Sequence, residues 1–238
     1  MNNLISVIIP VYNHSGTLEK CVGSIISQSY RPIEVIIIND GSMDGFEAVA
    51  GKILAGMQRP DLNVIIINQQ NQGAPAARNR GFAASKGDLV IFWDADTIAE
   101  PDMLAKMKSS LDNNTGAAYA YSGFKFGWKK FACRAFNADE LKKNNYIDVT
   151  SLIRRADFPG FDETIKRFQD WDLWLTMLEK NKTGVFVPEI LYAKIVGQRA
   201  GISRWLPSFL YHLPWATKEV RRYRSARSLV LEKHGLRQ

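Results

Sequence analysis

Four short runs of apolar, largely β-branched residues recur through the first hundred positions of the chain. Each run is continuously apolar rather than alternating, which is typical of strands buried on both faces of a sheet. We therefore predict four central strands, at Ile5–Ile9, Val35–Ile38, Val64–Ile67 and Leu89–Phe92.

Segments with helical periodicity fill the gaps between these runs. Ser15 is predicted to cap a helix whose apolar face lies within residues 18–26. Two more helices are predicted, from Pro75 to Lys86 and from Pro101 to about residue 113. Because strand and helix alternate, we expect an α/β fold with a mostly parallel, Rossmann-like central sheet flanked by helices.

The second half of the chain departs from this rhythm. Aromatic and basic side chains are interleaved over Tyr119–Asn137, and a strand is predicted near Tyr146–Ile153. A strongly amphipathic helix is predicted from about Asp170 to Lys180. Two short strands should follow, near Val185–Val187 and Leu191–Ile195.

The C-terminal residues 204–238 carry eight Lys or Arg residues and are predicted to form a basic helix. No repeat, low-complexity tract or linker divides the sequence. We therefore expect one catalytic domain over residues 1–204 and a basic helical extension over residues 205–238. The basic face of residues 214–238 suits contact with an anionic membrane surface, and packing on the domain is the equal alternative.

Composition limits the possible classes of protein. An apolar fraction of 46% argues against disorder, and the net charge of +7 favours an anionic partner. Cys21 and Cys133 offer neither a disulfide framework nor a zinc spacing. No signal peptide is evident, and no run approaches the roughly 20 apolar residues that span a bilayer. These features favour a cytoplasmic protein, either free or peripheral at the inner face of the membrane.

Polar segments follow each predicted parallel strand. In open α/β sheets, ligands bind beyond the carboxyl ends of the strands. The segments at this edge are Val11–His14, Asn39–Asp44, Asn68–Gly73 and Asp94–Thr97.

The last of these segments contains Asp94-Ala95-Asp96. Side chains at alternate positions of an extended strand end point the same way, so the two carboxylates should converge. Converging carboxylates repel each other and favour a cation, and oxygen ligands suit Mg²⁺ or Mn²⁺ shared with substrate phosphates. The alternative is a turn in which the aspartates accept local hydrogen bonds.

Five distinctive segments follow one another along the chain. They are VIIPVYN at 7–13, INDGSMDG at 38–45, NQGAPAARNRGFAASKGD at 71–88, FWDAD at 92–96 and FQDWDLWL at 168–175. With these segments in this order, the chain resembles the family 2 inverting glycosyltransferases of the GT-A fold over about residues 4–204.

The resemblance implies a metal-dependent enzyme that moves a sugar from a nucleotide donor, UDP-linked first, to a saccharide or lipid-linked acceptor. Cell-surface polysaccharide or glycolipid synthesis is the implied setting. Asp170 would be the general base, and Asp96 would bind Mn²⁺ or Mg²⁺. The implied donor-binding residues are Pro10, Tyr12, Asn13, Asp40, Arg78, Asp94 and Ala95, with Tyr12 against the nucleotide base and Asp40 at the uracil or ribose. A helix N-cap is the alternative role for Asp170.

Three positions depart from the family pattern. Thr97 stands where many relatives have a third acidic residue, and Gln169 where Glu is common. The loop after the last strands lacks the usual His. Gln198 would occupy its place, with Arg199 or Lys194 supplying positive charge to the pyrophosphate.

Other function classes fit less well. The aromatic and basic stretch Phe124–Phe136 invites a nucleic-acid binder, but stacking platforms do not require buried strands with acidic ends. We interpret that stretch as a mobile loop over the acceptor or as ordinary packing. A nucleotidyltransferase needs a Gly-rich basic loop after the first strand, and a dinucleotide oxidoreductase needs G-x-G-x-x-G; both are missing. An inactive relative that only binds sugar nucleotides stays open.

Overall fold

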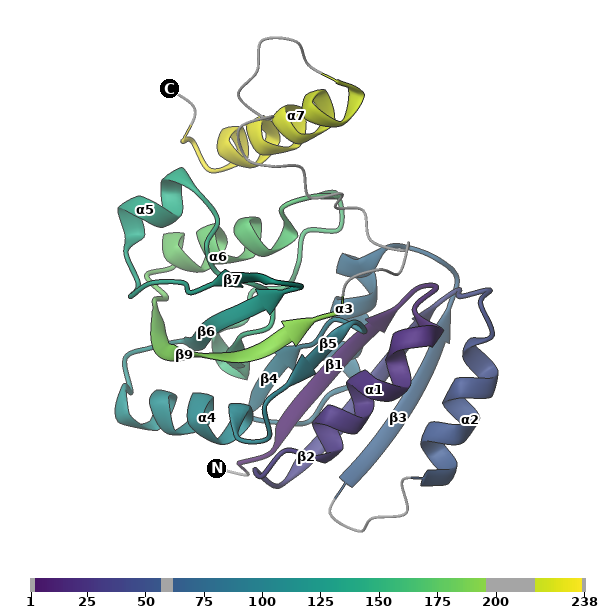
Figure 1. Ribbon diagram of the computed structural model, residues 1–238. Helices are drawn as coiled ribbons and strands as arrows, with labels where there is room; N and C mark the ends of the chain where they lie inside the picture. The colour runs from purple at the N-terminus through teal and green to yellow at the C-terminus, as the bar shows by residue number, and fades with distance from the viewer. Residues whose placement is uncertain (1–2, 57–61, 196–216, 237–238) are drawn as a thin grey trace.

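A single curled sheet organises the computed structural model, which describes residues 3–56, 62–195 and 217–236 (Figure 1). The strand order is β3-β2-β1-β4-β8-β6-β9-β5, with β7 paired to β6. The strands are β1 Ile5–Val11, β2 Ile33–Asp40, β3 Leu62–Gln69, β4 Leu89–Phe92, β5 Thr97–Ala99, β6 Tyr119–Phe126, β7 Lys129–Phe131, β8 Leu152–Arg154 and β9 Gly184–Lys194.

The first four strands are parallel, as the apolar runs predicted. β1 pairs with β2 and β4, and β2 pairs with β3, all in parallel. The four predicted runs lie inside these strands, and the structure confirms the α/β prediction. Beyond β4 the sheet is mixed, because β8 runs antiparallel to both β4 and β6.

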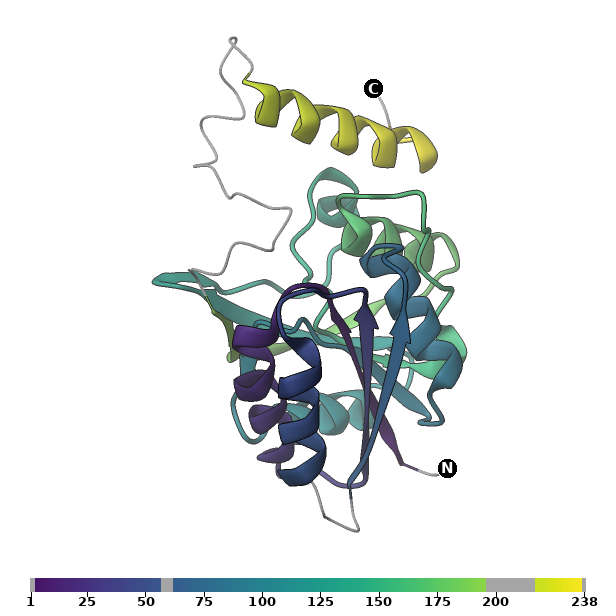
Figure 2. The same cartoon turned by 90° about the vertical axis from the view of Figure 1, so that its right-hand side faces the viewer.

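Both faces of β1, β2 and β4 are buried, which explains why their runs are continuously apolar, whereas β3 at the edge of the sheet is mostly half-buried. Val7 and Ile9 of β1 point into one core, which is completed by helices α1 Ser15–Ile26, α2 Phe46–Gly56 and α4 Met103–Asn113. Ile8 points into the other, with α3 Ala74–Ala84, α5 Ala138–Lys143 and α6 Gln169–Glu179. Figure 2 shows α1 and α2 on one side of these strands and α3 on the other.

Two predictions for the second half were wrong in their details. The two strands expected after residue 184 form one strand, β9, whose pairing with β6 shifts register between Ser122 and Phe124. The strand expected over Tyr146–Ile153 is confined to β8, because the segment before it is held in turns by Asp148 and Asn145. The stretch interpreted as a loop over Phe124–Phe136 includes the β6–β7 hairpin.

The helix starts also differ from the sequence prediction. His14, not Ser15, is the N-cap residue of α1, and the Ser15 hydroxyl instead donates to Asp44. Helix α3 begins at Ala74 and ends at Ala84, two residues before the predicted end at Lys86. Helix α4 begins at Met103, just after Pro101.

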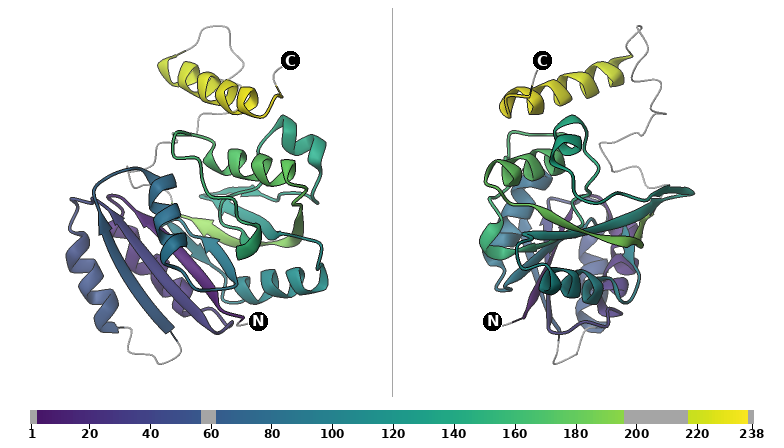
Figure 3. Two further views of the ribbon diagram at one scale, coloured as in Figure 1. Left: turned by 180° about the vertical axis from the view of Figure 1, so that it is seen from behind. Right: turned by 90° about the vertical axis from the view of Figure 1, so that its left-hand side faces the viewer.

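A last helix, α7 Lys218–Lys233, lies against α5 and α6 (Figure 3). Its Val230 is fully buried in the second core. Arg227 donates to the Lys143 carbonyl and lies over the Trp171 ring. Of the expected extension over residues 205–238, residues 205–216 and 237–238 lie outside the described part. No helix among the described residues combines the length and apolar character needed to cross a membrane.

Candidate active site

The loops after β1 and β2 are bonded to each other. Backbone N–H of Asn13, which has a φ of 54°, donates to Ser42 Oγ at 3.1 Å, and the Asn13 side chain accepts from Met43 N–H at 2.9 Å. Ser15 N–H donates to Asp44 at 2.8 Å. The left-handed turn at Asn13 is one that Asn tolerates well. These bonds fix one rim of the site.

Asp40, at the end of β2, is buried and holds the loop that follows β3. Its carboxylate accepts hydrogen bonds from the backbone N–H groups of Gln72 and Gly73 and from the Gln69 side chain, each at 2.8 Å. Asp40 therefore shapes the loop that leads into α3. Its predicted contact with uracil or ribose stays a prediction.

Tyr12 follows β1 directly and is 40% exposed. An exposed aromatic ring at the carboxyl edge of the sheet offers a face on which a nucleobase can stack. Pro10 lies beside it in β1, in register with Ile38 of β2. The structure thus places both residues at the carboxyl edge of the sheet, and their predicted contact with the donor stays a prediction.

Asp94 lies at the centre of an alternating chain of charges. Arg78, from α3, contacts one Asp94 oxygen at 2.9 Å, and Lys194, from the end of β9, contacts the other at 2.9 Å. Lys194 also contacts Asp148 at 2.7 Å. Burial alone would raise the pKa of Asp94, but Lys194 and Arg78 outweigh it and hold that pKa well below its usual range. Asp94 is therefore a carboxylate already neutralised by protein cations.

Asp96 is in the opposite situation. Its Oδ1 is buried and has no hydrogen-bond partner among the described residues. Burial and the neighbouring Asp94 charge raise the pKa of Asp96 to about 6. The expectation of an extended strand end here was wrong: Ala95, which is buried, and Asp96 lie in a turn, and Thr97 N–H donates to the Asp94 carbonyl at 2.9 Å.

These features fit a divalent cation, which would satisfy the free Asp96 oxygen and offset the repulsion that raises its pKa. No group of three or more His, Cys, Asp or Glu residues suited to a metal occurs within the described ranges. Since Mg²⁺ and Mn²⁺ commonly share ligands with substrate phosphates, Asp96 would be joined by the donor and water.

Asp170 lies in the first turn of α6. Phe168 holds the N-cap position, so the alternative role of Asp170 as an N-cap is wrong. The Asp170 carboxylate accepts from Trp171 N–H at 2.9 Å. Burial and the charge of Asp148 raise the pKa of Asp170 to about 6, against the opposing effect of a hydrogen bond from Asn145. A carboxylate with raised proton affinity is suited to accept a proton near neutral pH.

Asp148 and Lys194 connect these groups. Both act electrostatically on Asp96 and on Asp170. Because the two carboxylates feel the same pair of charges, they belong to one site built from β4, α6, β9 and the segment before β8. The sequence-predicted residues Asp94, Asp96, Asp170 and Arg78 are thus brought together.

Gln169 and Arg78 form a further link. Arg78 donates to Gln169 Oε1 at 2.8 Å while its guanidinium lies over the Phe161 ring. Because Gln169 is uncharged, it does not compete with Asp94 as an ionic partner of Arg78. Arg78 is thus a buried brace for Asp94 rather than a solvated helix residue.

Sequence reasoning missed Asp148 and Asn145. The available signal was a single acidic residue within the otherwise apolar run Ile147–Val149. Lys194, expected near the pyrophosphate, lies between Asp94 and Asp148. Gln198 and Arg199 lie outside the described residues. Thr97 is fully buried.

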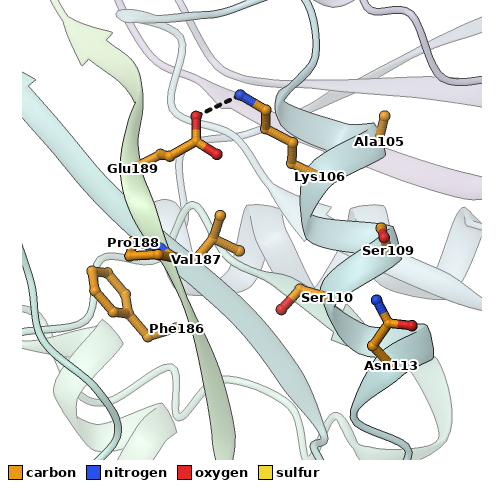
Figure 4. A pocket seen from close by; sticks show the side chains of 9 residues that line it. All are labelled: Ala105, Lys106, Ser109, Ser110, Asn113, Phe186, Val187, Pro188 and Glu189. Atoms are coloured by element: carbon orange, nitrogen blue, oxygen red, sulfur yellow. Dashed lines mark hydrogen bonds and ion pairs between the residues drawn. The ribbon is translucent and has the colours of Figure 1, made fainter.

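A shallow groove of about 450 Å³ lies elsewhere, between α4 and β9 (Figure 4). Its walls carry Lys106, Ser110, Phe186 and Glu189, and none of the predicted site residues lines it. An ion pair between Lys106 and Glu189 crosses its rim. The groove is therefore separate from the carboxylate cluster.

Comparison with known proteins identifies relatives of the chain. A family model described as glycosyl transferase family 2 matches residues 6–166. Glycosyltransferase GlyA of Streptococcus pneumoniae is 40% identical over 102 residues, which cover 43% of this chain and 14% of that protein. The uncharacterized glycosyltransferase YibD of Escherichia coli is 40% identical over 153 residues, 64% of this chain and 43% of that protein. The chain therefore matches less than half of either relative.

Solved structures share the fold. TarS of Staphylococcus aureus, residues 1–349 in complex with UDP, superposes with a TM-score of 0.67 at 18% identity, over 81% of this chain and 60% of that one. Mannosyltransferase PcManGT of Pyrobaculum calidifontis, in complex with GDP-Man and Mn²⁺, gives 0.68 at 17% identity, over 97% and 62%. The GT-A fold predicted from the sequence is confirmed.

Proposed function

The chain belongs to glycosyl transferase family 2, and from that premise we propose that it is an inverting, metal-dependent transferase. It moves a sugar from a nucleoside diphosphate, UDP first, to a hydroxyl group of a saccharide or lipid-linked acceptor. The structural neighbours bind UDP or GDP-Man with Mn²⁺, which supports this donor class. Synthesis of a cell-surface polysaccharide or glycolipid is the proposed setting.

One observation carries the proposal. The Lys194 ammonium contacts Asp94 and Asp148, and it acts electrostatically on both Asp96 and Asp170. Three carboxylates therefore share one site: Asp94, which is fully paired, Asp96, which has one oxygen without a partner among the described residues, and Asp170, which has a raised pKa. These three differ in their environments, and different environments give identical side chains different chemical roles.

The proposed roles follow from those environments. The oxygen of the acceptor hydroxyl attacks the anomeric carbon while Asp170 accepts the hydroxyl proton. The bond between the anomeric carbon and the diphosphate breaks on the opposite face. Asp94, held by Arg78 and Lys194, is a rigid hydrogen-bond acceptor for the donor ribose. Tyr12 stacks on the base, and Asp40 and Asn13 hold the loops around it.

Asp96 is the residue proposed to hold Mn²⁺ or Mg²⁺. When bound, such an ion neutralises charge on the departing diphosphate. Lys194 supplies a fixed positive charge of the chain itself at the same end of the sheet.

Replacement of the base tests the function. Asp170→Asn should lower kcat by roughly 10²–10⁴-fold while UDP binding measured by calorimetry with Mn²⁺ stays unchanged. Asn keeps the size of the side chain and its hydrogen bond from Trp171 N–H. Transfer is followed as release of UDP from a panel of UDP-sugars.

The matched control is Asp172→Asn, two positions along the same helix, where the carboxylate faces α7. It should retain turnover in solution. Wild-type turnover in Asp170→Asn would exclude Asp170 as the base. Failure of the wild type to bind any nucleotide with Mn²⁺ would remove the proposed function altogether.

A further inference from the structure

The β6–β7 hairpin ends in an exposed tryptophan. Gly127 and Trp128 form its two-residue turn between the paired residues Phe126 and Lys129. Gly127 has a φ of 57°, which suits the first position of a tight hairpin turn. Trp128 is 95% exposed. Figures 2 and 3 show the hairpin extending beyond the rest of the sheet.

The tip is basic as well as aromatic. Lys125, Lys129 and Lys130 are exposed around Trp128, and residues 124–134 contain no acidic residue. Such a surface attracts anions, and the hairpin segment 124–134 itself contributes no carboxylate to oppose them.

The hairpin is stiffened at its base by stacked rings. Phe124 stacks on Phe131 with centroids 4.7 Å apart and rings 5° from parallel, and on Tyr192 at 5.4 Å. The stack joins β6, β7 and β9. The exposed indole is therefore held away from the body of the protein by an ordered strand pair.

We propose that this hairpin tip docks on an anionic phospholipid surface. The indole ring prefers the boundary between headgroups and acyl chains, since it joins an apolar body to one polar N–H. Each lysine near an anionic leaflet adds to this attraction. A saccharide is a poorer occupant, because the tip is convex and small-ligand sites are concave.

The hairpin leaves the sheet at the active site. Phe126 is in register with Lys194, whose ammonium contacts Asp94. The same ammonium lies 5.7 Å from the centroid of the Phe124 ring. Docking of the tip would therefore bring the carboxylate cluster to the lipid surface. If the chain is the transferase proposed above, docking of the tip favours a lipid-carried hydroxyl acceptor over a free saccharide.

Vesicle sedimentation tests the docking directly. The full chain should pellet with vesicles of phosphatidylglycerol and phosphatidylcholine, and much less with phosphatidylcholine alone. The double variant Lys129→Glu/Lys130→Glu should lower the partition coefficient by at least about 10-fold. Trp128→Phe should retain part of the binding while losing the tryptophan quenching caused by brominated lipid.

The matched control carries the same charge change on α7, as Arg221→Glu/Arg222→Glu. It should bind vesicles as the wild type does. Loss of binding in this control, with normal binding in the hairpin variant, would overturn the proposal and assign the contact to the C-terminal helix. Absence of vesicle binding by the wild type would also overturn it.

The docking proposal and the proposed function fail separately. UDP binding by calorimetry should be unchanged in Lys129→Glu/Lys130→Glu, and transfer to a water-soluble acceptor should continue. Selective loss of transfer to an acceptor embedded in anionic vesicles is the expected result. If Asp170→Asn is fully active while vesicle binding persists, only the proposed function is lost.

Discussion

The pKa values of individual carboxylates determine which of them can accept a proton in this site. Asp170 and Asp96 both have a raised pKa of about 6, and burial is the main cause in each case. The second cause differs, since Asp148 acts on Asp170 and Asp94 acts on Asp96. A base must be ionised to accept a proton, so the raised pKa of Asp170 sets an acid limit on turnover.

The pH profile of kcat should therefore fall on the acid side with an apparent pKa of about 6. Below that pH Asp170 is protonated and transfer slows tenfold per pH unit. Measurement of kcat between pH 4.5 and 8, with saturating donor and metal, checks this. An acid limb near the ordinary carboxyl pKa of about 4 would contradict it.

Asp148→Asn provides the matched variant, because it removes the negative charge that raises the pKa of Asp170. The acid limb of kcat should move to lower pH. The amide oxygen introduced by this change could still accept a hydrogen bond from Lys194. A limb that stays in place would show that burial alone sets the Asp170 pKa.

Asp96→Ala should abolish Mn²⁺-dependent donor binding, since it removes the buried oxygen that has no partner in the described structure. The metal-dependent part of the UDP affinity is the quantity to compare by calorimetry, with and without chelator. Asp112→Ala, on the exposed end of α4, is the control and should leave both values unchanged. Equal metal enhancement in Asp96→Ala and the wild type would disprove the metal role.

At this scale the sequence predicted the carboxylates but not their environment. Asp94, Asp96 and Asp170 were recognisable because they follow strand or helix boundaries in a family order. Asp148 was not, because it lies in an irregular segment outside the five motif segments. Only the three-dimensional path of β9, which brings Lys194 between Asp94 and Asp148, makes that residue part of the site.

Among the elements, α3 depends on a close approach to the sheet. A Cβ added at Gly81 would lie 2.3 Å from Ile8 Cγ2 and 3.3 Å from Ile38 Cγ1. Both isoleucines are fully buried, so neither can move freely. Since α3 also carries Arg78, its distance from the sheet sets the position of the brace on Asp94.

Gly81→Ala should destabilise the protein by about 1–3 kcal/mol, the usual cost of overpacking a core. Urea unfolding followed by circular dichroism gives this free energy. Gly23→Ala on α1 is the matched control, because its Cβ would meet nothing within 4 Å. It should stabilise by about 0.5–1 kcal/mol, the gain of Ala over Gly in a helix. Equal effects of the two changes would refute the packing argument.

The error in β9 has a similar physical basis. Pro188 and Glu189 interrupt the apolar pattern, and Pro is normally confined to strand edges or bulges. The sequence therefore predicted two strands. In the structure the pairing of β6 with β9 shifts register across this point, and the strand continues through the irregularity to Lys194. An interrupted apolar pattern predicts a break in a strand, but it does not predict a register shift that lets the strand continue past the interruption.

Across the whole molecule, the two faces of the sheet are covered by different sets of helices. The first core is closed by α1, α2 and α4. The second continues outward through α6 to α7, whose Val230 is buried there. The basic face predicted for residues 214–238 left membrane contact and packing on the domain as equal alternatives. An amphipathic pattern predicts that one face of a helix is covered, but it does not identify the covering surface. For α7, the acidic residues of α6 show that the covering surface is the domain itself.

These acidic residues are Asp172 and Glu179. Asp172 is buried and lies 2.7 Å from Lys233 Nζ and 2.9 Å from His234 Nε2. Glu179 lies 2.7 Å from His234 Nδ1. Burial opposes the imidazolium, but its hydrogen bonds to Asp172 and Glu179 outweigh that cost and raise the pKa of His234.

Because the pKa of His234 is higher in the docked state, its contribution to docking is fully present below the unfolded pKa of about 6.5. It is lost as pH rises through the higher docked value, where the imidazole becomes neutral. Amide exchange over residues 218–233 should therefore quicken with pH beyond the intrinsic base-catalysed increase. His234→Gln keeps a polar group without a titrating charge, so it should abolish the additional pH-dependent increase in exchange. The contact of Lys233 with Asp172 should still hold α7 in part. An identical additional increase in His234→Gln would show that another group controls the attachment of α7.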